Sequence, residues 1–99
     1  MNIVEKNIDR LKSLCKKYKV TELYVFGSVL NNHFSSESDI DFIVSFDEIE
    51  LEKYADNYFD FKFSLEDLFS RNIDLLEEKA IKNPFFKDSI NNSKQLIYG

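Results

Sequence analysis

LYVFGS at residues 23–28 and DIDFIVSF at residues 39–46, ten residues apart, decide the fold of this chain. The first segment is a short apolar run that ends at Gly27-Ser28, which predicts a buried strand that stops at a glycine turn. In the second segment, every second residue is apolar, and the first two residues of the intervening set are Asp39 and Asp41. This alternation predicts a second strand with two carboxylates on its polar face.

A third strand is predicted further along the chain. Residues 72–76, NIDLL, place Ile73 and Leu75 on one face and Asp74 on the other. The polar stretch after the first strand predicts a loop that includes a short helix over residues 28–32. His33 lies alone in that loop, without a second His or Cys nearby, so it is interpreted as a solvated loop histidine.

Two helices are predicted at the ends of the chain. Residues 2–18 carry an apolar stripe at steps of three and four, with Asn2 as the expected cap. The stripe consists of Val4, Ile8, Leu11, Cys15 and Tyr18, which makes Cys15 a small core residue without chemistry. Asn83-Pro84 predicts the start of a last helix over residues 84–97. Its inward side chains are expected to be Phe86, Ile90 and Ile97.

A long helix is predicted between the second and third strands, after a solvated acidic connection that starts at Asp47. It has two apolar stripes. The first contains Leu51, Tyr54, Tyr58, Phe61, Leu65 and Leu68, and the second contains Ala55, Phe59 and Phe63. Together the stripes exceed the arc that one core-facing side needs. Two interpretations stay open: the chain covers both sides of the helix, or an exposed aromatic strip binds a partner.

Composition limits the classes of function. The 99 residues predict one domain over residues 1–99, and a core so small would gain from a partner chain or a second copy. The net charge of −5 argues against direct nucleic acid binding. One cysteine cannot form an internal disulfide. The first residues lack the pattern of a signal peptide, and no segment resembles a membrane span, so a cytoplasmic protein without membrane contact is expected.

The residues that carry chemistry are Gly27, Ser28, Asp39, Asp41 and Asp74. Gly27 lets the backbone approach an anion, and Ser28 offers a hydroxyl and an amide to a phosphate. Asp39 and Asp41 point to the same face of a strand and can bind the same hard cation. Asp74 on an adjacent strand could complete the cluster. Three such carboxylates imply Mg²⁺ or Mn²⁺, and two ions would serve an in-line phosphoryl displacement.

The order FGS, ten residues, SDIDFIV and then NIDLL resembles the minimal nucleotidyltransferases of the DNA polymerase β-like superfamily. These are the MNT antitoxins of HEPN–MNT toxin–antitoxin pairs. The resemblance covers nearly the whole chain. It implies an α/β (α+β) fold with a small mixed sheet of three to four strands and helices packed on it.

The resemblance also implies a role for each residue. Gly27 and Ser28 would hold the triphosphate of ATP, Asp39 and Asp41 would bind both metal ions, and Asp74 would be the third metal-site carboxylate and position the attacking hydroxyl. The reaction would move AMP to a tyrosine hydroxyl of a partner HEPN toxin, as in a type VII-like antitoxin. Because 99 residues hold only the nucleotide half of a transferase, the acceptor is expected on another chain.

One departure from the family pattern keeps alternatives open. Where the family commonly has Arg-Gly, this chain has Asn31-Asn32 and lacks a bidentate phosphate donor. The first alternative is a weak or inactive enzyme that neutralises its toxin by binding alone. The second is a transferase that modifies a small molecule of the aminoglycoside type, for which a dimer would have to supply an acceptor site. A homodimer or a hetero-oligomer is compatible with each.

Overall fold

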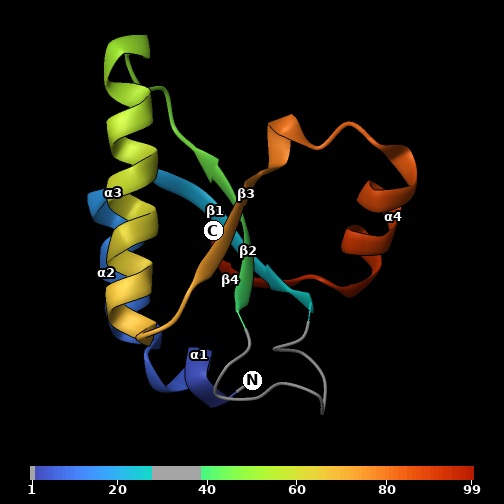
Figure 1. Ribbon diagram of the computed structural model, residues 1–99, viewed down its shortest axis with the longest axis horizontal. Helices are drawn as coiled ribbons and strands as arrows, with labels where there is room; N and C mark the ends of the chain where they lie inside the picture. Colours follow the sequence, from blue (N-terminus) through green and yellow to red (C-terminus); the bar gives the residue numbers. More distant parts are fainter. Residues whose placement is uncertain (1, 28–38) are drawn as a thin grey trace.

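The computed structural model describes residues 2–27 and 39–99 (Figure 1). Their elements are α1 (Asn2–Lys6), α2 (Ile8–Lys17), β1 (Val20–Phe26), β2 (Ile40–Phe46), α3 (Leu51–Phe69), β3 (Ile73–Glu77), the 3-10 helix η2 (Glu78–Ala80), α4 (Pro84–Ser93) and β4 (Gln95–Tyr98). The expected short helix over residues 28–32 lies outside the described residues. No helix among the described residues has the length and apolar character needed to cross a membrane.

The four strands form one mixed sheet in the order β3-β2-β1-β4. β1 pairs antiparallel with both β2 and β4, whereas β2 and β3 run parallel. The parallel pair requires a crossover, and α3 supplies it. The expected small mixed sheet with packed helices is therefore confirmed.

The core lies between one face of this sheet and the helices α2 and α3. Figure 1 shows these two helices together on one side of the sheet and α4 on the other. The sheet contributes Leu23, Val25, Ile40, Phe42, Val44, Ile73 and Leu75, all buried in one cluster. The helices contribute Leu11 and Cys15 from α2, and Phe61, Leu65 and Phe69 from α3. Alternation along the strands leaves the opposite face available for polar side chains.

The first helix is interrupted, so the expected single helix over residues 2–18 is wrong at Asn7. The Asn7 side-chain amide donates to the Ile3 carbonyl at 2.9 Å and replaces a backbone hydrogen bond. The chain turns there, and α2 starts at Ile8. The apolar stripe survives the break, because Val4, Leu11 and Cys15 are all fully buried. Burial raises the pKa of the Cys15 thiol to about 12, as expected for an unreactive core residue.

The last predicted helix is too long. Asn83 caps α4 as expected, accepting from the amides of Phe85 and Phe86 at 3.0 and 3.2 Å. The helix ends at Ser93, however, and residues 95–98 form β4. Ile97 therefore packs against the core from a strand. Ile90 is buried, whereas Phe86 is 44% exposed, so its inward placement is wrong.

The physical reason for the strand is the free edge of β1. Leu96 and Gln95 pair with Tyr24 and Val25 across that edge. A helix through residue 97 would leave the backbone groups of this edge without partners. The spacing of Ile90 and Ile97 fits a helix equally well, so local periodicity could not distinguish the two outcomes.

α3 has one buried side and one exposed side. Phe61, Leu65 and Phe69 are buried, and Tyr54, Tyr58 and Leu68 are half-buried. Phe59 and Phe63, from the second stripe, are 47% and 55% exposed. Leu51, assigned to the first stripe, is also exposed. Within the described residues, the chain does not cover both sides of this helix.

Candidate active site

Gly27 directly follows β1 in the chain. It lies next to the carboxylate of Asp41, which is on β2. Its φ of +79° lies in the left-handed region that favours glycine. A Cβ at this position would collide with Oδ2 of Asp41 and lie 3.3 Å from its carboxyl carbon. The structure thus brings together two predicted site residues from separate segments. Ser28, the Asn31-Asn32 pair and His33 lie outside the described residues.

Asp41 and Asp74 are register partners on the parallel strands β2 and β3. Both side chains therefore point to the sheet face opposite the core, as the alternation of both segments predicted. Asp39 immediately precedes the first residue of β2 and is exposed. The hydrogen bond from the Ile40 amide to the Asn72 carbonyl, at 3.3 Å, joins the starts of the two strands. The three predicted acids therefore lie near the starts of two neighbouring strands.

The surroundings of Asp41 disfavour its charged form. Its pKa is raised from 3.8 to about 6, mainly by burial and then by the negative charges of Asp74 and Asp39. Its neighbours on the same face are apolar: Phe26 is its register partner on β1, and Ile43, two residues further along β2, is buried. A cation near Asp41 would offset both the loss of hydration and the repulsion.

The donor set fits a hard divalent cation. Asp39, Asp41 and Asp74 offer carboxylate oxygens, the ligands that Mg²⁺ and Mn²⁺ prefer. Among residues 2–27 and 39–99, however, no three His, Cys, Asp or Glu side chains converge closely enough to hold an ion as they stand.

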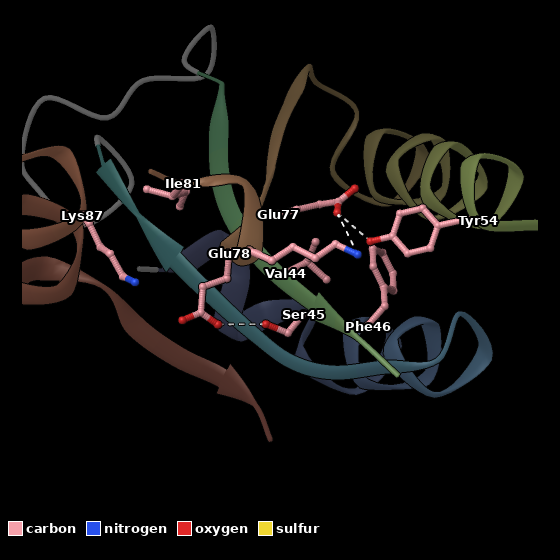
Figure 2. A pocket seen from close by; sticks show the side chains of 9 residues that line it. Val44, Ser45, Phe46, Tyr54, Glu77, Glu78, Ile81 and Lys87 are labelled. Atoms are coloured by element: carbon pink, nitrogen blue, oxygen red, sulfur yellow. Dashed lines mark hydrogen bonds and ion pairs between the residues drawn. The ribbon is translucent and has the colours of Figure 1, made fainter. Parts of the chain in front are cut away.

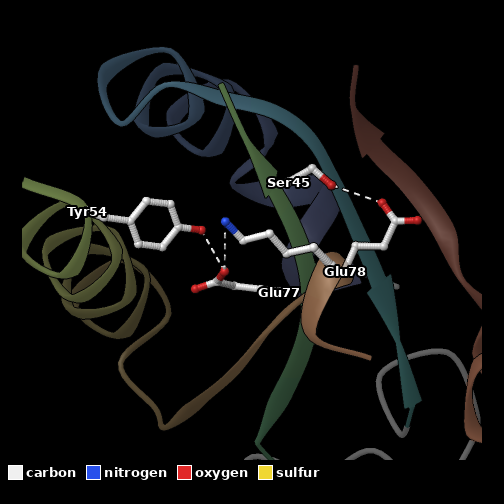
Figure 3. A network of polar contacts seen from close by, with 5 residues as sticks. Ser45, Tyr54, Glu77 and Glu78 are labelled. Carbon is white, nitrogen blue, oxygen red and sulfur yellow. Dashed lines mark hydrogen bonds and ion pairs between the residues drawn. The ribbon is translucent and has the colours of Figure 1, made fainter. Parts of the chain in front are cut away.

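A second group of acids lies at the other end of β2 (Figures 2 and 3). Ser45 is four residues beyond Asp41 on the same strand face, roughly 13 Å away. Ser45 Oγ donates to Glu78 at 3.0 Å, and Tyr54 Oη donates to Glu77 at 2.6 Å. The sequence patterns placed Tyr54 in an apolar stripe but predicted none of these polar contacts, because the partners come from β2, α3, the end of β3 and η2.

These residues line a cavity of about 400 Å³ together with Lys79 and Lys87. Lys79 Nζ lies 3.9 Å from Glu77 and 4.3 Å from the centre of the Tyr54 ring. Burial and the contact with Glu77 raise the pKa of Tyr54, so its hydroxyl stays protonated and keeps donating. These acids already have hydrogen-bond donors, and their contacts connect β2 to η2 and α3 to β3.

Known nucleotidyltransferases resemble this chain over most of its length. A family model described as nucleotidyltransferase domain matches residues 9–97. A Methanocaldococcus jannaschii protein named as a candidate protein adenylyltransferase is 40% identical over 87 residues, covering 88% of this chain and 84% of its own. Protein adenylyltransferase MntA of Thermococcus cleftensis is 31% identical over 94 residues, covering 88% of this chain and 82% of its own.

Solved structures share the fold. A candidate minimal nucleotidyltransferase superposes with a TM-score of 0.76 at 23% identity, over 93% of this chain and 90% of its own. A chain from the complex of tri-AMPylated Shewanella oneidensis HEPN toxin with MNT antitoxin has a TM-score of 0.65 at 17% identity, over 96% of this chain and 71% of its own. The family model and the archaeal relatives both span most of the chain, and with the fold and the acidic cluster they lead to one conclusion: this protein belongs to the nucleotidyltransferase domain family.

Proposed function

We propose that this chain is a Mg²⁺-dependent protein adenylyltransferase of the cytoplasm that silences a HEPN-type toxin by moving AMP from ATP to a tyrosine hydroxyl. The observation that carries the proposal is the half-buried Asp41, held against Gly27 and beside Asp74. Two relatives over 30% identical are named for protein adenylylation. A structural neighbour is titled as an AMPylated HEPN toxin with its MNT antitoxin, and another as a toxin–antitoxin pair with AMP-PNP.

The residues divide the work as follows. Asp39 and Asp41 would hold the metal, which when bound neutralises phosphate charge and polarises the bond to the leaving group. Gly27 and Ser28 would hold the triphosphate, Gly27 through its backbone and Ser28 by donating to a phosphate oxygen. Asp74 would accept a hydrogen bond from the tyrosine hydroxyl and orient it for attack on the α-phosphorus. Pyrophosphate leaves as the new ester bond forms, and the hydroxyl proton passes to a base or to water.

The test mixes this protein with ATP, Mg²⁺ and the HEPN protein encoded beside it, followed by intact-mass measurement of the HEPN protein. We expect a mass increase of one or more AMP groups, located on tyrosine by peptide mapping. Asp41→Asn is the matched control and should give no increase. An unmodified HEPN protein after incubation with the wild type, under conditions in which an active MNT–HEPN pair reacts, would contradict the proposal.

A second candidate function is neutralisation of the toxin by binding alone. The exposed Phe59 and Phe63 favour it, because an apolar surface on a small protein commonly marks a binding site. In this case the double variant Asp39→Asn/Asp41→Asn should still protect cells that express the toxin. Loss of protection in that variant, with normal expression and toxin binding, would reject binding alone and support adenylylation.

A further inference from the structure

The outward side of α3 carries a pair of exposed aromatic rings. Phe59 and Phe63 stack with their centroids 6.1 Å apart and their planes 29° from parallel. They lie on the side of the helix opposite the buried Phe61 and Leu65. Side chains of this size, exposed together at the centre of a helix face, form an apolar surface that water solvates poorly.

An acidic row lies beside these rings. Helical spacing places Asp56, Asp60 and Asp67 along one flank of the pair, and all three are exposed. α3 carries five acidic residues, Glu52, Asp56, Asp60, Glu66 and Asp67, against two lysines. One of those lysines, Lys53, lies 3.5 Å from Glu50, which precedes the helix. The outward side of α3 therefore combines an apolar centre with a negative flank.

We call this surface the acidic–aromatic face; it consists of Phe59, Phe63, Asp56, Asp60 and Asp67. Its negative charge indicates which kind of partner it can bind. A second copy packed through the same helix adds a second strongly negative surface, at a cost in like-charge contacts. Nucleic acids and anionic membranes are repelled for the same reason. A basic amphipathic helix matches both the aromatic rings and the acidic row. Its apolar residues cover the rings, and its Lys or Arg residues pair with the acids.

We infer that the acidic–aromatic face of α3 is the docking surface for a basic amphipathic helix of the toxin partner. The identity of that partner rests on the proposed function, but the chemistry of the surface does not. α3 packs on the core side of the sheet, whereas Asp41 and Asp74 point to the other side. Docking on α3 and the chemistry proposed for Asp41 are therefore on opposite sides of the sheet.

The separation makes the inference testable with two matched variants. Phe59→Ala/Phe63→Ala removes the aromatic pair of α3. Phe85→Ala/Phe86→Ala removes an equal number of rings from α4, where these side chains are 84% and 44% exposed. Titration calorimetry with the full HEPN protein encoded beside this chain measures the dissociation constant for each. We expect at least about a tenfold increase for the α3 variant and less than about a twofold change for the α4 variant.

Charge provides the second measurement. Asp56→Asn/Asp60→Asn should weaken binding by several-fold and reduce its dependence on salt concentration, because opposite charges across an interface are screened by salt. Thermal unfolding of each variant should match the wild type, since the replaced side chains lie outside the core. If the unfolding temperature of Phe59→Ala/Phe63→Ala falls, Phe59→Gln/Phe63→Gln takes its place, because glutamine also removes the rings but fills more of their volume and still favours a helix.

Three outcomes would overturn the inference: wild-type affinity in the α3 variant, loss of affinity in the α4 variant alone, or a wild-type homodimer that Phe59→Ala/Phe63→Ala converts to a monomer in sedimentation. Failure of the proposed function has a different signature, namely no AMP transfer by the wild type while binding still depends on α3. If both ideas hold, the α3 variant transfers AMP with a raised KM for the toxin and an unchanged kcat.

Discussion

Acidic side chains lie near both ends of β2, but their neighbours differ. At the end near Ser45, Glu78 and Glu77 accept hydrogen bonds from hydroxyl groups, and Lys79 adds a positive charge (Figure 3). At the start of the strand, Asp41 faces Asp74 and Asp39, and its pKa rises to about 6. Acids that accept hydrogen bonds connect elements of the fold. Acids that lie close to other acids repel one another, and a bound cation reduces this repulsion. The contrast separates a structural cluster from the proposed catalytic one on the same sheet.

The largest expected effect is on activity. Asp41→Asn should lower the rate of AMP transfer by about 10³-fold or more, because the variant removes the proposed metal ligand and its charge at the proposed reacting centre. Glu77→Gln, at the other end of β2, should change the rate less than about threefold. Initial rates of radiolabelled AMP incorporation measure both. Equal losses in the two variants would erase the distinction between the two clusters.

The next effect concerns the contact between Gly27 and Asp41. Gly27→Ala should reduce AMP transfer by about 10²-fold, because the added Cβ displaces the Asp41 carboxylate and a displacement of about 1 Å is sufficient for such a loss. The positive φ also makes alanine unfavourable in the folded state, by about 1 kcal/mol. Steady-state rates and denaturant unfolding measure the two effects. Wild-type activity in Gly27→Ala would show that Asp41 tolerates displacement.

The structural cluster should respond in stability and not in rate. Tyr54→Phe removes the hydroxyl that donates to Glu77 and should lower the free energy of unfolding by about 1 kcal/mol. Its rate of AMP transfer should match the wild type. Urea unfolding monitored by circular dichroism measures the change. Ser45→Ala is a parallel case at the Glu78 contact, and a loss of activity in both would place this cluster in the reaction.

The smallest effect is the pH dependence of stability without divalent cations. Because the pKa of Asp41 is higher in the folded protein than its ordinary 3.8, the folded state binds the proton more tightly. The contribution of Asp41 to stability is therefore fully present below about pH 4 and declines as the pH rises through about 6. Asp41→Asn should remove this decline and unfold about 2–5 °C higher than the wild type at pH 7 in EDTA.

Melting curves of both proteins between pH 4 and 8 test this expectation. Added Mg²⁺ should raise the melting temperature of the wild type more at pH 7 than at pH 5, because protons compete with the ion for the carboxylates. The asparagine variant should respond less at both pH values. A wild-type stability that rises from pH 4 to 6, relative to Asp41→Asn, would contradict the assigned direction.

The sheet face that carries Asp41 and Asp74 could be predicted because its signals are local. Alternation in residues 39–46 and 72–76 was sufficient to place Asp41 and Asp74 on the polar side of their strands, and the turn at Gly27 ends β1 as expected. Local patterns failed where a helix and a strand both fit the spacing of the apolar residues. Ile97 fits a helix by spacing, but the open edge of β1 recruits residues 95–98 as a strand. The hydroxyl–acid contacts of Tyr54 and Ser45 span 23 and 33 residues, so no local pattern reports them.

The sequence by itself therefore determined the element types around the acidic motif and the residues that carry charge there, because side-chain direction alternates along a strand whatever the strand packs against. Only the tertiary structure decided that Asp41 lies against Gly27 and beside Asp74, that the second stripe of α3 faces solvent, and that residues 95–98 form β4. These outcomes depend on pairing and packing between distant segments, where burial and strand-edge hydrogen bonds outweigh local preference.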